Sequence, residues 1–490
     1  MRVAVALASG LLCGLCFPPF DLGPVALVAL VPLLWTWRGA RPLPAALYGF
    51  VFGIGCYGIV LEWIRYFGAV AIVPLVAVMA LAIAVTGALV ASFARRGIAS
   101  PLLTAAVWVI LEAFRGQAPL GGFPWADLGV SLHDIAPARA LAGLGGTLLV
   151  TFAVVAFNGF ALDGIVALRS QHTREAAMAT IGLVAILVFV TIADVARYEP
   201  RATGSLRFAI LQGDDEELPL ALQTTQQLTD DHLALAARLR GKYDLVVFPE
   251  SAVDTNPEFD PFLEDELTAI AAEHDTSVLV NARTPAGDGR SYNSNLLYEP
   301  SGRLQGIYSK QHLVPFGEYV PWRAELSFIG ELRQIPYDYA AGDERVLFRV
   351  DGHEIGSVIC FESAFGPLVR DFVRDGAEAI VVSTSNRSYR RSGNSEQHLA
   401  LSQMRASETA RPVLQASVSG ISGVIDADGN VSDTTSLFEK AIVQGRITTM
   451  TGETPYIRFG EWIVLLSALG VLGATVFVVA RHRRATSPAT

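Results

Sequence analysis

Long apolar stretches fill the first 196 residues of this 490-residue chain and return once near its carboxyl end, whereas residues 200–458 mix apolar and polar positions. A helix needs about 20 consecutive apolar residues to cross the hydrocarbon core of a bilayer, and somewhat fewer where it is tilted. Eight segments meet this requirement, so the pattern predicts a multi-pass α-helical membrane domain with eight spans. They are residues 3–17, 22–37, 43–64, 69–93, 100–114, 139–165, 176–195 and 461–480.

The region between the last two spans has a different pattern, in which short β-branched runs alternate with helical ones. This alternation is typical of a layered α/β domain. We therefore divide the chain into a membrane domain with seven helices at 1–198, an α/β domain at 205–450, and an eighth helix with a basic tail at 459–490. The predicted strands are 206–211, 245–248, 277–281, 294–298, 355–359, 379–383, 413–417 and 423–426, and the predicted helices are 219–240, 260–274, 364–375 and 395–410.

The distribution of arginine predicts the orientation in the membrane. Short cytoplasmic loops retain Lys and Arg, and here the segments after the second, fourth, sixth and eighth spans are all basic. Both termini are therefore expected in the cytoplasm, and the α/β domain on the extracytoplasmic face of a bacterial inner membrane. The arginines concerned are Arg38, Arg41, Arg95, Arg96, Arg169, Arg174, Arg481, Arg483 and Arg484.

Composition narrows the class of function. Hydrophobic residues make up 51% of the chain and charged residues only 17%, which is too apolar for one soluble domain. The net charge is −10 and no basic patch is visible, so nucleic acid is not an expected partner. The histidines are scattered without a ligand spacing, so we expect no metal and no cofactor.

One thiol in the α/β region stands out. Cys360 is the only cysteine after Cys56, and in an oxidising compartment a thiol without a disulfide partner is either an inert packing group or a reactive one. Glu250 ends the apolar run that forms a predicted strand, and Lys310 is one of only three lysines in the chain. Because Glu250 and Cys360 each follow a strand, both are expected at the carboxyl edge of a sheet, where sites form in α/β proteins.

These residue types have complementary roles in acyl transfer. A thiol is nucleophilic as the thiolate, so it needs a base, and Glu250 is the candidate. Attack on an acyl carbon creates an oxyanion, which requires a cation and N–H donors. Lys310 supplies the charge, and the amide of Phe361 is a candidate donor. His312 and His398 are alternative bases, but the sequence places no orienting group beside either.

The motifs around these residues resemble a known family. The run from Lys310 to Pro321 is the most specific of them, and the resemblance extends over nearly the whole chain. It is to the apolipoprotein N-acyltransferase family, a membrane branch of the nitrilase (carbon–nitrogen hydrolase) superfamily. The motifs are Phe-Pro-Glu250, Lys310-Gln-His-Leu-Val-Pro-Phe-Gly-Glu318-Tyr-Val-Pro321, Cys360-Phe-Glu362-Ser, Phe17-Pro-Pro-Phe-Asp21, Gly49-Phe-Val-Phe-Gly53 with Trp63, Gly122-Phe-Pro-Trp125, Gln397-His-Leu, Met404-Arg-Ala and Arg411-Pro-Val.

The resemblance implies a four-layer αββα sandwich on an eight-helix membrane domain. It also implies that an acyl chain passes from a phospholipid donor to Cys360, where it forms a thioester. The chain then passes to a diacylglyceryl apolipoprotein acceptor. Glu250 would be the base and Lys310 the oxyanion partner, with Glu318 and Glu362 as supporting acids. The default oligomeric state is a monomer. A membrane-anchored amidase or hydrolase, an acyltransferase with another lipid or amine acceptor, and a catalytically silent lipid-binding protein are the alternatives.

The chain departs from the family pattern in three places. Phe361 stands where the family often has Tyr, and the segment 214–217 is acidic where an aromatic residue commonly follows. The segment 387–393 is basic in place of an acidic-Ala-Trp-Phe run. Arginines there are candidates for binding phospholipid phosphate. The candidate substrate-binding residues are Trp125, which belongs to a loop at 116–127 that is either interfacial or a plain connection, and Arg387, Tyr389 and Arg390.

Overall fold

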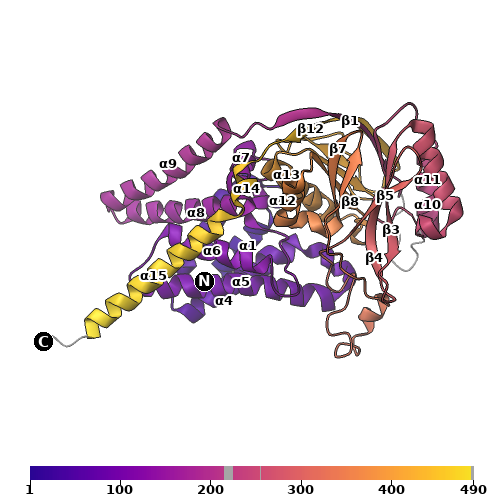
Figure 1. Ribbon diagram of the computed structural model, residues 1–490. Coiled ribbons are helices and arrows are strands. Elements are labelled where there is room, and N and C mark those ends of the chain that lie inside the picture. The colour runs from indigo at the N-terminus through magenta and orange to yellow at the C-terminus, as the bar shows by residue number, and fades with distance from the viewer. Residues whose placement is uncertain (215–224, 254, 487–490) are drawn as a thin grey trace. The chain divides into compact units, whose positions relative to one another are not determined.

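The computed structural model describes residues 1–214, 225–253 and 255–486. It divides into two compact units, each described separately below (Figure 1). One consists of Met1–Arg197 together with Phe459–Thr490, and the other of Tyr198–Arg458.

The first unit is built of helices. Five of its described helices are long and apolar enough to cross a membrane. They are α4 (Pro42–Val60), α5 (Ala69–Arg95), α8 (Thr147–Arg169), α9 (Thr173–Val195) and the part Trp462–Arg481 of α15. The remaining ones are shorter. The helices are α1 (Arg2–Gly14), α2 (Ala26–Ala29), α3 (Val31–Trp37), α4 (Pro42–Val60), α5 (Ala69–Arg95), α6 (Pro101–Arg115), α7 (Ala136–Gly145), α8 (Thr147–Arg169), α9 (Thr173–Val195) and α15 (Trp462–Thr486), with 3-10 turns η1 (Gly23–Val25), η2 (Glu62–Phe67) and η3 (Leu128–Leu132).

Two of the predicted spans are interrupted. The segment 139–165 is divided between α7 and α8 at Gly146, whose φ of 77° lies in the left-handed region that favours glycine. The segment 22–37 forms η1, α2 and α3 instead of one helix. A hydropathy window counts apolar residues and does not register such a break, which is why the sequence predicted continuous helices here.

Small residues let the first helices approach closely. A methyl group at Gly10 of α1 would lie 2.1 Å from the carbonyl oxygen of Phe52 on α4, and one at Gly53 would lie 2.5 Å from Cα of Ala80 on α5. In an apolar solvent, where lipid tails are as hydrophobic as side chains, close backbone packing of this kind is a main source of helix association. We attribute the packing of α1, α4 and α5 to these glycines.

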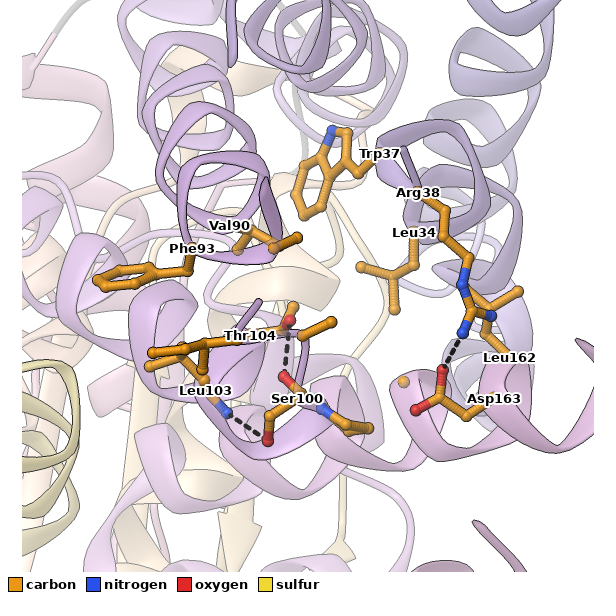
Figure 2. Close-up of a pocket in the computed structure, with 15 residues that line it drawn as sticks. Leu34, Trp37, Arg38, Val90, Phe93, Ser100, Leu103, Thr104, Leu162 and Asp163 are labelled. Atoms are coloured by element: carbon orange, nitrogen blue, oxygen red, sulfur yellow. Dashed lines mark hydrogen bonds and ion pairs between the residues drawn. The ribbon is translucent and has the colours of Figure 1, made fainter. Parts of the chain in front are cut away.

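A cavity of about 90 Å³ lies among α3, α5, α6 and α8 (Figure 2). Its walls are largely apolar, with Trp37, Phe93 and Leu162 among them. Arg38 and Asp163 form an ion pair of 3.0 Å at one side, and Ser100 caps the start of α6 by accepting from the Leu103 amide.

The second unit contains two six-stranded sheets. The first has the order β12-β1-β2-β3-β4-β5 and the second β11-β10-β9-β8-β7-β6. In the first sheet β1, β2 and β3 are parallel, and in the second β7, β8 and β9 are parallel. The strands are β1 (Arg201–Gln212), β2 (Leu245–Val247), β3 (Ser277–Pro285), β4 (Ser291–Tyr298), β5 (Leu304–Ser309), β6 (Leu347–Val350), β7 (His353–Ile359), β8 (Ala379–Thr384), β9 (Val413–Ser417), β10 (Gly423–Ile425), β11 (Val431–Ser432) and β12 (Ala441–Thr451).

Helices cover both sheets. Figure 1 shows α10 (Thr225–Ala236) and α11 (Pro261–His274) on the side of the first sheet, where their apolar residues join a buried cluster with β1 to β4. The second sheet packs against α12 (Gly366–Asp375) and α13 (Asn394–Thr409). The two sheets contact each other, and the Asn295 side chain of β4 donates to the Ser357 hydroxyl of β7 over 2.7 Å.

All eight predicted strands are present, but β5, β6, β11 and β12 were not predicted. The four helices also occur, although the first described residue of α10 is Thr225, and residues 219–224 of that prediction lie outside the described residues. The strand β12 pairs antiparallel with β1 across more than 200 residues of sequence. Such a strand is stabilised by a distant partner, so its own pattern carries little information.

Candidate active site

Cys360 lies directly after β7, at the first position of the 3-10 turn η7 (Cys360–Ala364). Its φ of 53° is left-handed, which costs a residue with a side chain about 1 to 3 kcal/mol and persists only where the surroundings hold it. At this sharp turn from strand to helix the residue as a whole is half-buried. Strain of this kind is common at functional residues.

The amine of Lys310 is buried between two carboxylates. Lys310 follows β5, is 1% exposed, and lies 2.9 Å from Oε1 of Glu318 but 3.7 Å from Oε1 of Glu250. Glu318 is thus the nearer counter-ion, and its Oε2 also accepts from the Val314 amide. Glu250 is the more distant of the two carboxylates from this amine.

Glu250 belongs to the first sheet, whereas Cys360 belongs to the second. Pro249 ends the strand segment before Glu250, and Ser251 after it has a φ of 61°. The backbone thus turns sharply at this residue. Oε2 of Glu250 accepts from the amide of Ser385, which follows β8, the parallel neighbour of β7. This hydrogen bond of 3.0 Å connects the Glu250 carboxylate to the strand beside the cysteine.

The sequence analysis missed two asparagines that hold the carboxylates. Nδ2 of Asn293 in β4 donates to Oε1 of Glu250 over 2.8 Å and to Oε1 of Glu318 over 3.1 Å. Nδ2 of Asn281 in β3 donates in turn to Oδ1 of Asn293. Asparagines are depleted in strands, so their presence in two buried strands was the available indication of a special role.

Glu362 links the segments that carry Lys310 and Cys360. Its Oε1 accepts from the Tyr308 hydroxyl at 2.9 Å, from the Gln311 amide at 2.7 Å and from the His312 amide at 3.1 Å. Its Oε2 accepts from the Ile359 amide at 2.8 Å. The side chain is fully buried. The lysine and the cysteine are each adjacent in sequence to one of these donors, so the carboxylate fixes their relative position.

Electrostatics keeps the thiol protonated at rest. Burial and the negative charge of Glu250 raise the pKa of the Cys360 thiol to about 12, against the opposing effects of Lys310 and a Thr384 hydrogen bond. Burial lowers the pKa of Lys310, but Glu318 and Glu250 outweigh it and leave that pKa well above its usual value. The site therefore holds a charged amine and a neutral thiol, and the thiol needs a base to react.

The two alternative bases differ in their contacts. Nε2 of His398 lies 3.1 Å from the carbonyl oxygen of Cys360, so it bonds to the backbone and not to sulfur. Burial lowers the pKa of His398 to about 4. The ring of His312 stacks on Phe365 at 4.0 Å, and its Nδ1 has no hydrogen-bond partner among the residues that the structure describes. The bond of His398 to the backbone counts against it as the base, and Glu250 as the base stays a prediction.

The basic segment after β8 is anchored internally. Arg387 forms an ion pair of 2.9 Å with Asp214, and both side chains are buried. The ion pair ties Arg387 to the start of the unit's acidic segment, and its role in binding a lipid phosphate stays a prediction. Tyr389 and Arg390 are both half-buried. Of the acidic segment 214–217, positions 215–217 lie outside the described residues.

The two remaining predicted residues are buried aromatics. Phe361 is 6% exposed and packs edge-on against Phe365 with ring centroids 5.0 Å apart. Trp125 belongs to the first unit, where its ring contacts Trp63 at 5.5 Å and its carbonyl oxygen accepts from Arg115. Trp125 is 4% exposed, and its contact with a lipid substrate stays a prediction.

Comparison with known proteins first defines the class. Residues 207–456 match the profile of the carbon–nitrogen hydrolase family, which assigns the second unit to that class. Residues 9–160 match the profile of the apolipoprotein N-acyltransferase N-terminal domain. A relative called apolipoprotein N-acyltransferase from Methylococcus capsulatus is 32% identical and covers 99% of this chain and 97% of its own. Another of that name, from Geobacter metallireducens, is 30% identical and covers 98% of this chain and 95% of its own. The chain belongs to the apolipoprotein N-acyltransferase family.

Proposed function

We propose that this protein moves a fatty acyl chain from a phospholipid, through a thioester on Cys360, to the α-amine of the S-diacylglyceryl cysteine of a lipoprotein. The observation that carries the proposal is the buried amine of Lys310 between Glu318 and Glu250, together with Cys360 among their electrostatic neighbours. Family membership supports the lipid and lipoprotein substrates.

In the first half-reaction, Glu250 takes the proton of the Cys360 thiol while sulfur attacks the sn-1 ester carbon. The new S–C bond pushes the carbonyl electron pair onto oxygen, where Lys310 and the Phe361 amide stabilise the charge. Collapse breaks the ester C–O bond. The departing oxygen receives the proton from Glu250 and leaves as a lysophospholipid.

In the second half-reaction, the neutral amine of the lipoprotein attacks the thioester carbon. Glu250 takes a proton from the amine, and collapse of the tetrahedral intermediate breaks the C–S bond and returns the electron pair to sulfur. The thiolate of Cys360 then recovers the proton from Glu250. Glu318 keeps Lys310 charged and oriented throughout, and Glu362 holds the backbone on both sides of the site.

We further propose the setting of this chemistry. The first unit is a membrane domain of eight spans in a bacterial inner membrane, in which the shorter helices complete the five long ones. The second unit is a four-layer αββα catalytic domain. Both termini lie in the cytoplasm and the second unit lies on the extracytoplasmic face, as the arginine distribution predicts. The protein acts as a monomer. The residues that contact the lipid substrates are Trp125, Arg387, Tyr389 and Arg390.

The decisive experiment is mass spectrometry of a synthetic diacylglyceryl lipopeptide incubated with the purified full-length protein and phospholipid that carries a labelled acyl chain. We expect one labelled chain on the peptide α-amine, and no product with Cys360→Ala. The control is Cys56→Ala, which removes a buried thiol of the first unit.

Release of labelled fatty acid without N-acylated peptide would identify a hydrolase instead. If no acyl thioester can be trapped on the protein and Cys360→Ala changes nothing, the protein only binds lipid. Either result would overturn the proposed function.

A further inference from the structure

Asn281 lies in β3, between the strand that precedes Glu250 and the strand that carries Asn293. Its side chain is 3% exposed, and its Oδ1 accepts from the amide of Ser251 over 3.0 Å. Ser251 directly follows the proposed base and has the left-handed φ of 61° described above. A strained turn persists only where its surroundings hold it. The Asn281 side chain is one of the groups that hold this one.

The contact with Ser251 fixes the direction of the Asn281 amide. A backbone N–H can only donate, so the oxygen of the side chain faces Ser251 and Nδ2 points away from it. Nδ2 donates to two asparagines of β4, reaching Oδ1 of Asn293 over 2.8 Å and Oδ1 of Asn295 over 3.0 Å. Each of these asparagines therefore turns its own Nδ2 toward the groups beyond it.

On one side of the network, Asn293 presents N–H groups to the two carboxylates beside Lys310. It donates to Oε1 of Glu250 and to Oε1 of Glu318, as described above. If this amide were turned over, its oxygen would face two carboxylate oxygens, and its N–H groups would face Nδ2 of Asn281. The contacts at both ends of Asn293 therefore require the same orientation.

On the other side, Asn295 joins the network to the second sheet. Its Nδ2 donates to the hydroxyl oxygen of Ser357 over 2.7 Å and lies 3.5 Å from that of Ser383. Ser357 belongs to β7, which leads into Cys360, and Ser383 belongs to the neighbouring strand β8. All three polar side chains are fully buried. Since unpaired polar groups are costly in such a place, each contact constrains the next.

We propose that Asn281 is a positioning residue for acyl transfer, because it holds the turn after Glu250 and sets the direction in which the Asn293 amide meets Glu250 and Glu318. Three buried asparagines at the centre of a sheet, where apolar side chains pack at less cost, fit this role. Asn281 acts through Ser251 and Asn293 and takes no proton, so the balance of both half-reactions is unchanged. The inference rests on the proposed function, in which Glu250 is the base, and deepens it.

The variant Asn281→Asp separates the two roles of the amide. Aspartate has the same shape and can still accept from the Ser251 amide, but an ionised carboxylate cannot donate to Asn293 or Asn295. We expect kcat for N-acylation of the lipopeptide to fall by roughly tenfold or more, the size of one or two lost hydrogen bonds. The KM for phospholipid should change less. An unchanged kcat in the folded variant would overturn the inference.

The matched control is Asn256→Asp in the same unit. Asn256 is also buried, and its Oδ1 accepts from the Glu258 amide over 3.1 Å while its Nδ2 donates to Oε2 of Glu258 over 3.3 Å. The substitution again keeps an acceptor and removes a donor, but within a single turn. We expect a kcat close to that of the wild type. Equal losses in Asn256→Asp and Asn281→Asp would contradict a specific role for Asn281.

A double-mutant cycle tests the coupling to Asn293. If Asn281 acts through Asn293, then Asn281→Asp should lower kcat little further in a protein that already carries Asn293→Leu. Losses that multiply fully would refute the positioning role. Should Asn281→Asp fail to fold, Asn281→Ser takes its place in the cycle, because the shorter side chain adds no charge and cannot reach both asparagines.

Hydrogen exchange tests the turn without any substrate. The Ser251 amide is followed by mass spectrometry of the full-length protein. It should exchange roughly tenfold faster or more in Asn281→Leu than in the wild type, and at nearly the wild-type rate in Asn281→Asp, which keeps the acceptor. If Asn281→Leu does not fold, Asn281→Ala gives the same comparison. Equal exchange in all the proteins would refute the hold on the turn. Because exchange needs no lipid, a wild type that fails to N-acylate would overturn the proposed function alone.

Discussion

Replacement of Glu362 by Gln tests how the two halves of the site are held together. The carboxylate accepts from four donors, which are three backbone amides and one phenol. Burial raises the pKa of Glu362, against the opposing hydrogen bonds of those backbone amides and the charge of Lys310. Three of the four partners are backbone amides, which can only donate, and we infer from them that the carboxyl is ionised in the folded state.

The magnitude follows from the number of acceptors. A glutamine amide keeps one oxygen, which can serve the three donors at Oε1, but its NH₂ group then faces the Ile359 amide. One hydrogen bond to a charged group is lost and a buried N–H is left unpaired. Together these effects lower the free energy of unfolding by about 2 to 4 kcal/mol. For a unit of this size that corresponds to a fall in the midpoint of thermal unfolding of roughly 5 to 15 °C.

Activity should fall as well. The Ile359 amide immediately precedes Cys360, so its displacement moves the nucleophile relative to Lys310. A misplacement of about 1 Å can cost on the order of 10²-fold in rate. Thermal unfolding of the purified full-length protein in detergent measures the first effect, and N-acylation of the lipopeptide under saturating phospholipid measures the second.

The matched control is Glu299→Gln, which breaks an exposed pair with Arg303 in the same unit. We expect the free energy of unfolding of this control to change by no more than about 1 kcal/mol, as is typical when a surface ion pair is removed. If Glu362→Gln matched this control in unfolding and kept wild-type turnover, the carboxyl would be protonated in the folded state. The inference of an ionised clamp would then be wrong.

Three further outcomes follow from the same geometry. Asn293→Leu removes the side-chain amide that donates to both Glu250 and Glu318. The value of kcat/KM for N-acylation should fall measurably, by up to about 10²-fold. An unchanged kcat/KM would show that neither carboxylate needs this amide. Alkylation of wild-type Cys360 should rise about tenfold per pH unit from pH 7 to 10 without a plateau, because the thiol pKa is about 12; a plateau near pH 9 would contradict that pKa. His398 has a pKa of about 4 when folded, below its ordinary value of about 6.5. The unfolded state therefore binds more protons between these values, and the free energy of unfolding should decrease as pH falls through that interval. Urea unfolding at pH 7 and pH 4.5 measures the decrease, and His398→Gln should reduce it; an identical pH dependence in that variant would refute the assignment.

The candidate site shows where sequence analysis succeeds. Glu250 and Cys360 could be placed at strand ends because a buried strand is a short, local and recognisable pattern. The strands before them belong to different sheets, however, so the rule that parallel strands bring their carboxyl ends to one edge of a sheet does not account for both residues. The motif around Lys310 was specific enough to be noticed without any knowledge of the fold. The missed strands β5, β6, β11 and β12 show the limit, since their pairing partners decide whether such segments become strands.

The sequence alone identified the candidate reactive groups, Glu250, Lys310 and Cys360. It also determined the division of the chain into apolar regions and regions of mixed polarity. Both depend on residue type and local order. Only the tertiary structure decided which carboxylate neutralises Lys310, that Asn293 bridges Glu250 and Glu318, and that Glu362 joins the backbone on both sides of the site. It also gave Arg387 a partner at Asp214. The physical reason is that charge interactions and hydrogen bonds change with differences of a few tenths of an ångström in the distance between atoms from different strands, and no local pattern records those distances.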